Sequence, residues 1–221
     1  MDPRSMYSSA SQPSVLQTNK VLRSTYMLLA MTLLFSAVCA GVAMAVGISP
    51  IMSLGMTIGA FVTLFILNKT AESASGIAWV FVFTGLLGGS LGYTLNYYVG
   101  VGGPGLIMEA LGATAIVFFA LSGYVLTTKK DFSFMGGFLV VGLVMAIIAM
   151  FANIFFQVPA VSLALNAVIV FLMSGFILYD TSRIINGGET NYIRATVSMY
   201  LNLYYLFTSL LHLLGAFGGD D

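Results

Sequence analysis

The sequence has very little charge. Only 7% of its 221 residues are Asp, Glu, Lys or Arg and 59% are hydrophobic, whereas soluble domains carry about 25% charged residues. A chain of this composition lacks the polar side chains needed to cover a water-exposed surface, which excludes an ordinary soluble domain. Its formal net charge is zero, so it also lacks the overall positive field that gathers nucleic acid.

Cysteine and histidine each occur once, as Cys39 and His212. A single cysteine excludes an internal disulfide, and the two residues together are too few for a Cys/His metal cluster. The sequence has no G-x-x-x-x-G-K-[ST] phosphate-binding loop, and the H-E-x-x-H motif of metalloproteases requires two histidines. We therefore expect neither an enzyme nor a cofactor-binding protein.

What the sequence has instead is a series of long apolar runs. Seven of them reach the roughly 20 residues that a helix needs to cross a bilayer. They predict an all-α polytopic membrane protein, with residues 1–20 as a disordered cytoplasmic tail and 21–219 as one helical bundle embedded in the lipid bilayer. The expected spans lie at about 24–46, 51–68, 77–98, 105–127, 134–156, 161–179 and 196–217.

The basic residues lie in four places, and every second turn between the expected spans contains none. Cytoplasmic loops of membrane proteins carry an excess of Lys and Arg, so the pattern predicts a cytoplasmic N-terminus and, after seven crossings, a C-terminus on the outer face. The eight residues are Arg4, Lys20 and Arg23, then Lys69, then Lys129 and Lys130, then Arg183 and Arg194.

Two carboxylates remain once the termini and the inner loops have been set aside. Glu109 lies early in the fourth expected span, and Asp180 follows the last apolar residues of the sixth. A carboxylate at membrane depth usually faces a partner or a water-filled cavity. Asn166 and Met173 precede Asp180 at intervals of seven residues, which places the three on roughly one side of a helix.

Polar residues recur on one face of the last expected span. Their spacing of four, three, four and three residues keeps them on one side of a helix that other helices shield from lipid. If this face meets the sixth span, Asp180 and Asn202 form a buried cluster with one or both of the nearby arginines. The cluster is either a proton- or cation-responsive gate or a hydrogen-bond network that holds helices together. The polar residues are Ser198, Asn202, Tyr205, Ser209 and His212.

Glycines also recur at intervals of four in the third expected span, as Gly85 and Gly89 and as Gly88 and Gly92. Small residues at this spacing let helix backbones approach closely in a membrane. We expect these glycines to serve packing within the bundle rather than dimerisation.

Several motifs resemble those of the Bax inhibitor-1 family of seven-helix membrane proteins. They are Lys-Lys-Asp-Phe-Ser-Phe (129–134), Ala-Asn-Ile-Phe-Phe (152–156), Leu-Tyr-Asp (178–180) and Ser-Met-Tyr-Leu-Asn-Leu-Tyr-Tyr-Leu-Phe (198–207). Segments 21–26 and 187–198 resemble the bacterial YccA branch of the family. The resemblance covers about residues 20–219 and implies a fold in which the seventh helix lies at the centre of the other six.

The resemblance implies two candidate functions. Members of the YccA branch bind the membrane-anchored metalloprotease FtsH in the bacterial inner membrane, where they restrain its action on membrane substrates. Other members are pH-sensitive calcium leak channels, in which two aspartates share a proton and close the pore, and an arginine at the end of the second helix pairs with them. Asp180 matches the first aspartate and would be the calcium ligand, whereas Asn202 stands in the second position and Lys69 is a loose counterpart of the arginine. We rank FtsH modulation first, a calcium or proton leak second, and a purely structural bundle third.

Overall fold

The computed structural model describes residues 15–73 and 75–218. Within them, six helices are long and apolar enough to cross a membrane: α1 (Val15–Val46), α2 (Pro50–Thr70), α3 (Ser75–Thr128), α4 (Gly136–Phe156), α5 (Pro159–Ile185) and α6 (Tyr192–Phe217). A short 3₁₀ helix, η2 (Ser133–Met135), precedes α4. The chain is therefore an all-α polytopic membrane protein, as its composition predicts.

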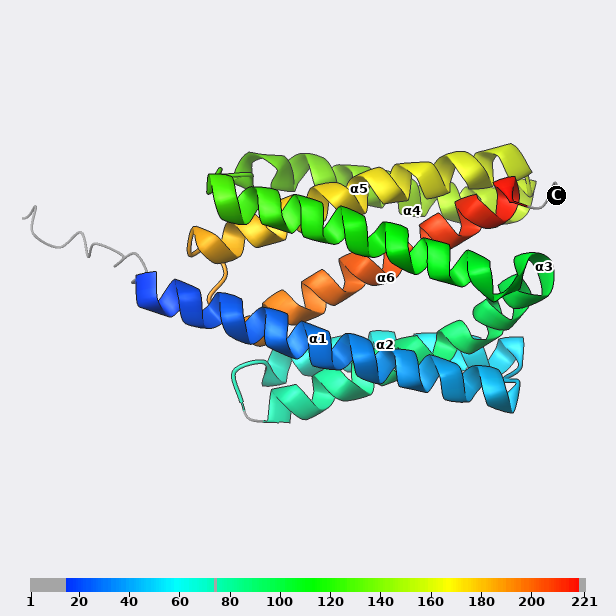
Figure 1. Cartoon of the computed structure of the whole chain (residues 1–221), viewed down its shortest axis with the longest axis horizontal. Coiled ribbons are helices and arrows are strands. Elements are labelled where there is room, and N and C mark those ends of the chain that lie inside the picture. The colour runs from blue at the N-terminus through cyan, green and yellow to red at the C-terminus, as the bar shows by residue number, and fades with distance from the viewer. Residues whose placement is uncertain (1–14, 74, 219–221) are drawn as a thin grey trace, which may run out of the picture.

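The longest helix, α3, has 54 residues and is interrupted at Gly103. This glycine has φ 71° and ψ 176°, a conformation that residues with a Cβ rarely adopt, and the following Pro104 has no backbone N–H to donate. The chain reverses direction at this point, so α3 consists of two arms that run to and from the same end of the molecule (Figure 1). The two arms correspond to the expected third and fourth spans.

Three helix ends differ from the predicted ones. α1 begins at Val15, so residues 15–20 of the expected tail are helical, and residues 1–14 lie outside the described part. α5 continues to Ile185 and α6 begins at Tyr192, whereas the sequence predicts 179 and 196. An apolar run marks the part of a helix that lies in lipid, and the backbone hydrogen bonds of a helix continue into the polar residues beyond it. Asp180, Arg183 and Arg194 consequently lie on helices and not in a loop.

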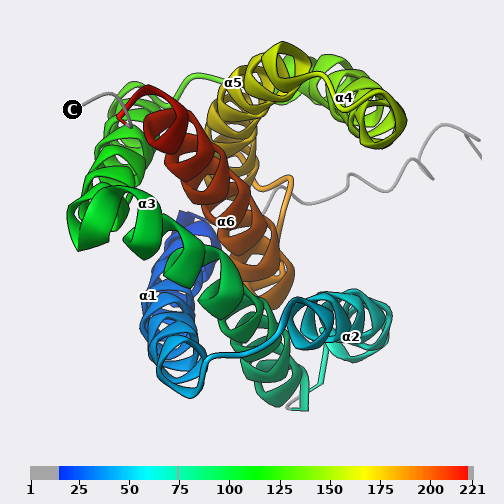
Figure 2. The same ribbon diagram turned by 90° about the vertical axis from the view of Figure 1, so that its right-hand side faces the viewer.

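The last helix, α6, lies between the two halves of the bundle (Figure 2). It packs against α1, α3 and α5, while α2 packs chiefly on α3 and α4 chiefly on α5. Of the six spans it has the largest buried share, and Met199, Leu206 and Leu211 on it are inaccessible to solvent. Its position buries Asn202 and Ser209 and partly buries Ser198 and Tyr205. Most of the polar face is therefore shielded as predicted, whereas His212 is exposed.

Glycines on the first arm of α3 allow α1 and α2 to approach it closely. A Cβ at Gly88 would overlap the backbone of Ser36 on α1, and a Cβ at Gly92 would overlap Ala43. Gly89 faces a methionine of α2. The expected role of these glycines in packing within the bundle is therefore confirmed.

Candidate functional site

Asp180 is the centre of a small polar cluster between α5 and α6. Its side chain is only 6% exposed, and its Oδ2 atom accepts a hydrogen bond from Ser198 Oγ at 2.6 Å and another from Asn202 Nδ2 at 2.7 Å. Ser198 and Asn202 are four residues apart and therefore neighbours on one helix face. The structure thus brings together three of the residues that the sequence selects.

The two nearby arginines bind other groups. Arg183 lies 3.6 Å from the carboxylate of Glu189 and donates to the Gly188 carbonyl at 3.0 Å. Arg194 pairs with Glu72 at 3.3 Å. With Asp180 they line a cavity of about 20 Å³, which has room for about one water molecule. The arginines therefore flank the cluster without a hydrogen bond to Asp180 in the part of the chain described.

Because the Arg194–Glu72 pair is largely exposed, with side-chain exposures of 47% and 80%, we expect Arg194→Gln to have little effect on stability. The free energy of unfolding should change by less than about 1 kcal/mol, the usual value for an exposed ion pair. Thermal unfolding of the purified protein in detergent measures this change, with Lys129→Gln as a control of equal charge. A loss several times larger than in the control would show that Arg194 supports the buried carboxylate.

The other predicted site residues lie away from Asp180. Asn166 donates to a carbonyl of its own helix and is 14 positions before Asp180 in the sequence, about 21 Å along α5. His212 is exposed near the end of α6, where its Nδ1 atom lies 2.7 Å from a backbone carbonyl one turn earlier. Lys69, in the last turn of α2, and Glu109, on the second arm of α3, are both exposed.

Sequence periodicity missed the two tyrosines that connect α6 to the helices on its other side. Tyr200 Oη lies 2.6 Å from Ser36 Oγ on α1 and donates to the Thr84 carbonyl of α3 at 3.2 Å. Tyr204 Oη lies 3.2 Å from Ser90 Oγ, also on α3. The interval of four residues between the tyrosines is a signal in the sequence, but both lie outside the polar stripe formed by Ser198, Asn202, Tyr205, Ser209 and His212.

Sequence periodicity also missed Ser182, which connects α5 to the loop after α3. Its hydroxyl accepts from the Phe132 backbone N–H at 2.8 Å and donates to Asp131 Oδ1 at 3.4 Å. Asp131 Oδ1 also accepts from the hydroxyl and the backbone N–H of Ser133, at 2.6 and 2.8 Å. The Ser133 hydrogen bonds, with a smaller contribution from Ser182, hold the pKa of Asp131 below its ordinary value. The loop is therefore anchored two residues from Asp180.

The geometry around Asp180 fits a link between helices better than a cation site. Within the described residues, no three His, Cys, Asp or Glu side chains lie close enough together to hold a metal ion. Calcium takes six to eight oxygen ligands, whereas Asp180 is met by an amide N–H and a hydroxyl that both donate to it. What this arrangement does directly is join the end of α5 to α6.

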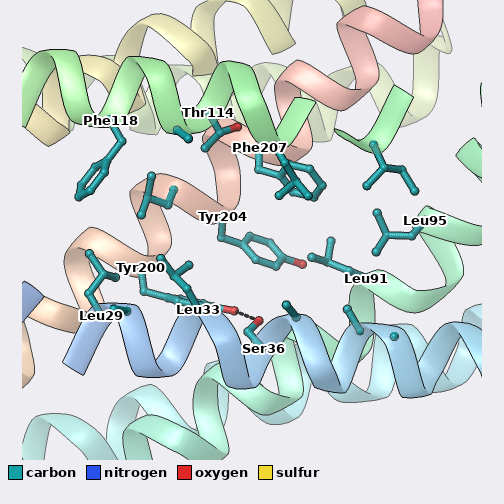
Figure 3. A pocket seen from close by; sticks show the side chains of 18 of the residues that line it. Leu29, Leu33, Ser36, Leu91, Leu95, Thr114, Phe118, Tyr200, Tyr204 and Phe207 are labelled. Atoms are coloured by element: carbon teal, nitrogen blue, oxygen red, sulfur yellow. Dashed lines mark hydrogen bonds between the residues drawn. The ribbon is translucent and has the colours of Figure 1, made fainter. Parts of the chain in front are cut away.

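A long apolar cavity of about 500 Å³ lies on the other side of α6, beside Tyr200 and Tyr204 (Figure 3). Its walls are formed by α1, by both arms of α3 and by α6. Sequence periodicity does not predict this space, because its volume depends on how far α1 lies from the second arm of α3.

Known proteins are similar to this chain over nearly its whole length. A sequence profile of the family described as "Inhibitor of apoptosis-promoting Bax1" matches residues 18–219. The "Modulator of FtsH protease YccA" of Escherichia coli (strain K12) is 52% identical over 213 residues, which cover 96% of this chain and 97% of that protein. The "Inner membrane protein YccA" of E. coli O6:H1 has the same identity and coverage. An "Uncharacterized membrane protein" of Vibrio cholerae is 51% identical over 215 residues, or 96% of each chain.

Proposed function

The chain belongs to the Bax inhibitor-1 family, and on that premise we propose that it modulates the FtsH protease in the bacterial inner membrane. The observation that carries the proposal is the identity of 52% with the E. coli modulator over nearly the full length of both proteins. The chain is not an enzyme, so it acts by binding. We propose that it binds the FtsH complex and restrains its action on membrane-protein substrates.

Affinity purification of the tagged full-length chain from native membranes tests the partnership. We expect FtsH to co-purify, and we expect the half-life of an FtsH membrane substrate to shorten when the gene is deleted. An unrelated tagged multi-pass protein at the same abundance is the control. If FtsH is absent from the eluate and the substrate half-life is unchanged, the proposal fails, and a purely structural bundle becomes the better account.

We also propose that the two arms of α3 cross the membrane separately, which gives seven crossings. The start of α1, the α2–α3 loop, the end of α3 and the α5–α6 loop all lie at one end of the bundle, and α6 ends at the other (Figure 1). This end of the bundle carries Lys20 in α1, Lys69 in the last turn of α2, Lys130 just after α3 and Arg183 in the last turn of α5. Since basic residues favour the cytoplasmic side, this arrangement supports a cytoplasmic N-terminus and a periplasmic C-terminus.

Cysteine labelling tests this orientation, because Cys39 is the sole cysteine of the chain. In a Cys39→Ala background, we expect Gly100→Cys to react with a membrane-impermeant maleimide added outside intact spheroplasts. Lys130→Cys, from the opposite end of the bundle, should react only after the membrane is permeabilised. The Cys39→Ala protein without a new cysteine is the control, and the reverse labelling pattern would invert the proposed topology.

The calcium-leak alternative has less support in this chain. Asn202 stands where the channels have a second aspartate, and its amide donates a hydrogen bond to Asp180. With only one carboxylate in the pair, Asp180 and Asn202 cannot share a proton as two aspartates do. A pH-dependent calcium flux into liposomes that Asp180→Ala abolishes would favour the channel in spite of Asn202.

A further inference from the structure

The apolar cavity beside α6, which Tyr200 and Tyr204 line, is a long and narrow groove. On α1 its lining residues recur from Tyr26 to Met44, about 27 Å along the helix at 1.5 Å per residue. This length approaches the hydrocarbon thickness of a bilayer, about 30 Å. Spread over that length, the volume of about 500 Å³ open to the centres of water molecules gives a mean cross-section about 5 Å across. Adding the radius of a water molecule, about 1.4 Å, on each side makes the groove roughly 8 Å wide from wall to wall.

A space of this shape fits one hydrocarbon chain. An α-helix with its side chains is about 10–12 Å across, wider than the groove, so a transmembrane helix of a partner cannot reach its inner wall. Carbon atoms in contact lie about 3.5–4.0 Å apart, so an extended acyl chain touches the walls on several sides. The inner wall is largely apolar and includes Leu29, Leu95 and Phe207, as Figure 3 shows.

The groove opens on the outer surface of the bundle. Leu33, Leu111 and Phe119 line it, yet they are 36%, 46% and 69% exposed. In a membrane protein the medium at this surface is lipid, because the residues lie within spanning helices. Acyl chains of the bilayer therefore have direct lateral access to the groove.

One end of the groove holds a polar atom that lacks a partner. The hydroxyl oxygen of Tyr26 is buried and has no hydrogen bond within the described residues, while its ring packs against Phe118 with centroids 5.9 Å apart. Leaving a buried hydroxyl unpaired costs about 1–3 kcal/mol. Tyr26 lies in the same part of α1 as the basic residues Lys20 and Arg23.

Arg23 extends the same face of α1 by one turn toward that end. It precedes Tyr26 by three residues, an interval that places two side chains side by side on a helix. Arg23 is exposed, and no ion pair involves it among residues 15–73 and 75–218. A guanidinium group binds phosphate oxygens in a bidentate manner, and basic residues at this depth attract anionic lipids.

We propose that the groove binds one acyl chain of an anionic phospholipid from the cytoplasmic leaflet. The acyl chain lies along α1 from Tyr26 toward Ala37, because a chain from one leaflet spans only about half of the roughly 30 Å hydrocarbon thickness. The Tyr26 hydroxyl donates to an ester or phosphate oxygen, and Arg23 binds the phosphate. The site lies on the opposite side of α6 from Asp180, and it does not depend on FtsH binding.

Lipid retention by the full-length protein tests this proposal. The protein is reconstituted in vesicles of equal phosphatidylglycerol and phosphatidylcholine, extracted in mild detergent and weighed by native mass spectrometry. We expect one retained phosphatidylglycerol per chain. Ala37→Phe places a ring in the groove and should lower this retention at least fivefold, whereas Ala45→Phe, on the same helix but outside the groove, should leave it unchanged.

A second pair of variants tests the headgroup contact. Arg23→Gln should lower the preference for phosphatidylglycerol over phosphatidylcholine roughly fivefold, the effect of about 1 kcal/mol per basic residue near a membrane surface. Lys129→Gln removes an equal charge from a loop and should preserve the preference. Equal retention by Ala37→Phe and Ala45→Phe, or an unchanged preference in Arg23→Gln, would overturn the proposal.

A photocrosslinking side chain at position 37 distinguishes a lipid from a partner polypeptide as the occupant of the groove in native membranes. A lipid adduct is the expected product. A crosslinked polypeptide would overturn the lipid site in favour of a partner helix. Co-purification of FtsH with the Ala37→Phe variant tests the lipid site separately from FtsH binding. We expect this variant to lose the lipid and still to bind FtsH.

Discussion

Asn202→Leu is expected to lower the free energy of unfolding by about 1–3 kcal/mol, the usual cost of leaving a buried polar group without its hydrogen-bond partner. Asn202 is itself 6% exposed, and its amide donates to Asp180 Oδ2 at 2.7 Å. Leucine has nearly the same size but no donor, so the buried carboxylate keeps only the hydrogen bond from Ser198. Unfolding of the purified protein in mixed micelles, followed by circular dichroism, measures the change.

The double variant Asp180→Leu, Asn202→Leu is the matched control. Replacing both partners of a buried hydrogen bond by apolar groups is far less costly than removing one, since no polar group is left unpaired. We therefore expect the double variant to recover part of the stability that Asn202→Leu loses. If Asn202→Leu alone is as stable as the parent chain, the cluster does not hold α5 to α6.

Gly88→Ala is expected to be the most damaging single-methyl change in the bundle. The added Cβ would overlap the carbonyl oxygen and Cα of Ser36, and a backbone cannot rotate away as a side chain can. α1 must then move off α3, which also stretches the hydrogen bond between Ser36 and Tyr200. We expect a loss of at least about 3 kcal/mol, at the upper end of the range for overpacked cores.

Gly112→Ala is the control for Gly88→Ala. Gly112 lies on the second arm of the same helix, and a Cβ there would meet no atom within 4 Å. Alanine favours a helix over glycine by about 0.5–1 kcal/mol, so this variant should be as stable as the parent or slightly more stable. Thermal unfolding of both variants measures the difference, and equal stability would contradict the close contact between α1 and α3.

Much of the architecture follows from the sequence, because lipid imposes simple rules on it. A span needs a long apolar run, and a turn needs residues that end a helix, as Gly103 and Pro104 do in α3. The meeting of Asp180 with Ser198 and Asn202 was also predictable, since a buried carboxylate requires donors and the spacing on α6 supplies two of them. These inferences use only local periodicity and the cost of unpaired charge.

The other features of the site depend on the distances between helices, and the periodicity of the sequence does not predict these distances. Arg183 and Arg194 looked like partners of Asp180, but Glu189 and Glu72 lie within reach of them after folding. The hydroxyls of Tyr200 and Tyr204 meet serines that are more than a hundred residues away in the sequence. The groove is bounded by α1, by both arms of α3 and by α6, so its volume depends on the distances between these helices.

The rate at which FtsH degrades a membrane substrate tests the central claim most directly. FtsH and the substrate are reconstituted in proteoliposomes with increasing amounts of this chain or of an unrelated multi-pass protein. We predict that degradation slows as the amount of this chain rises, while the unrelated protein leaves the rate unchanged. A degradation rate that stays constant up to a molar excess of the chain over FtsH would contradict the proposed function.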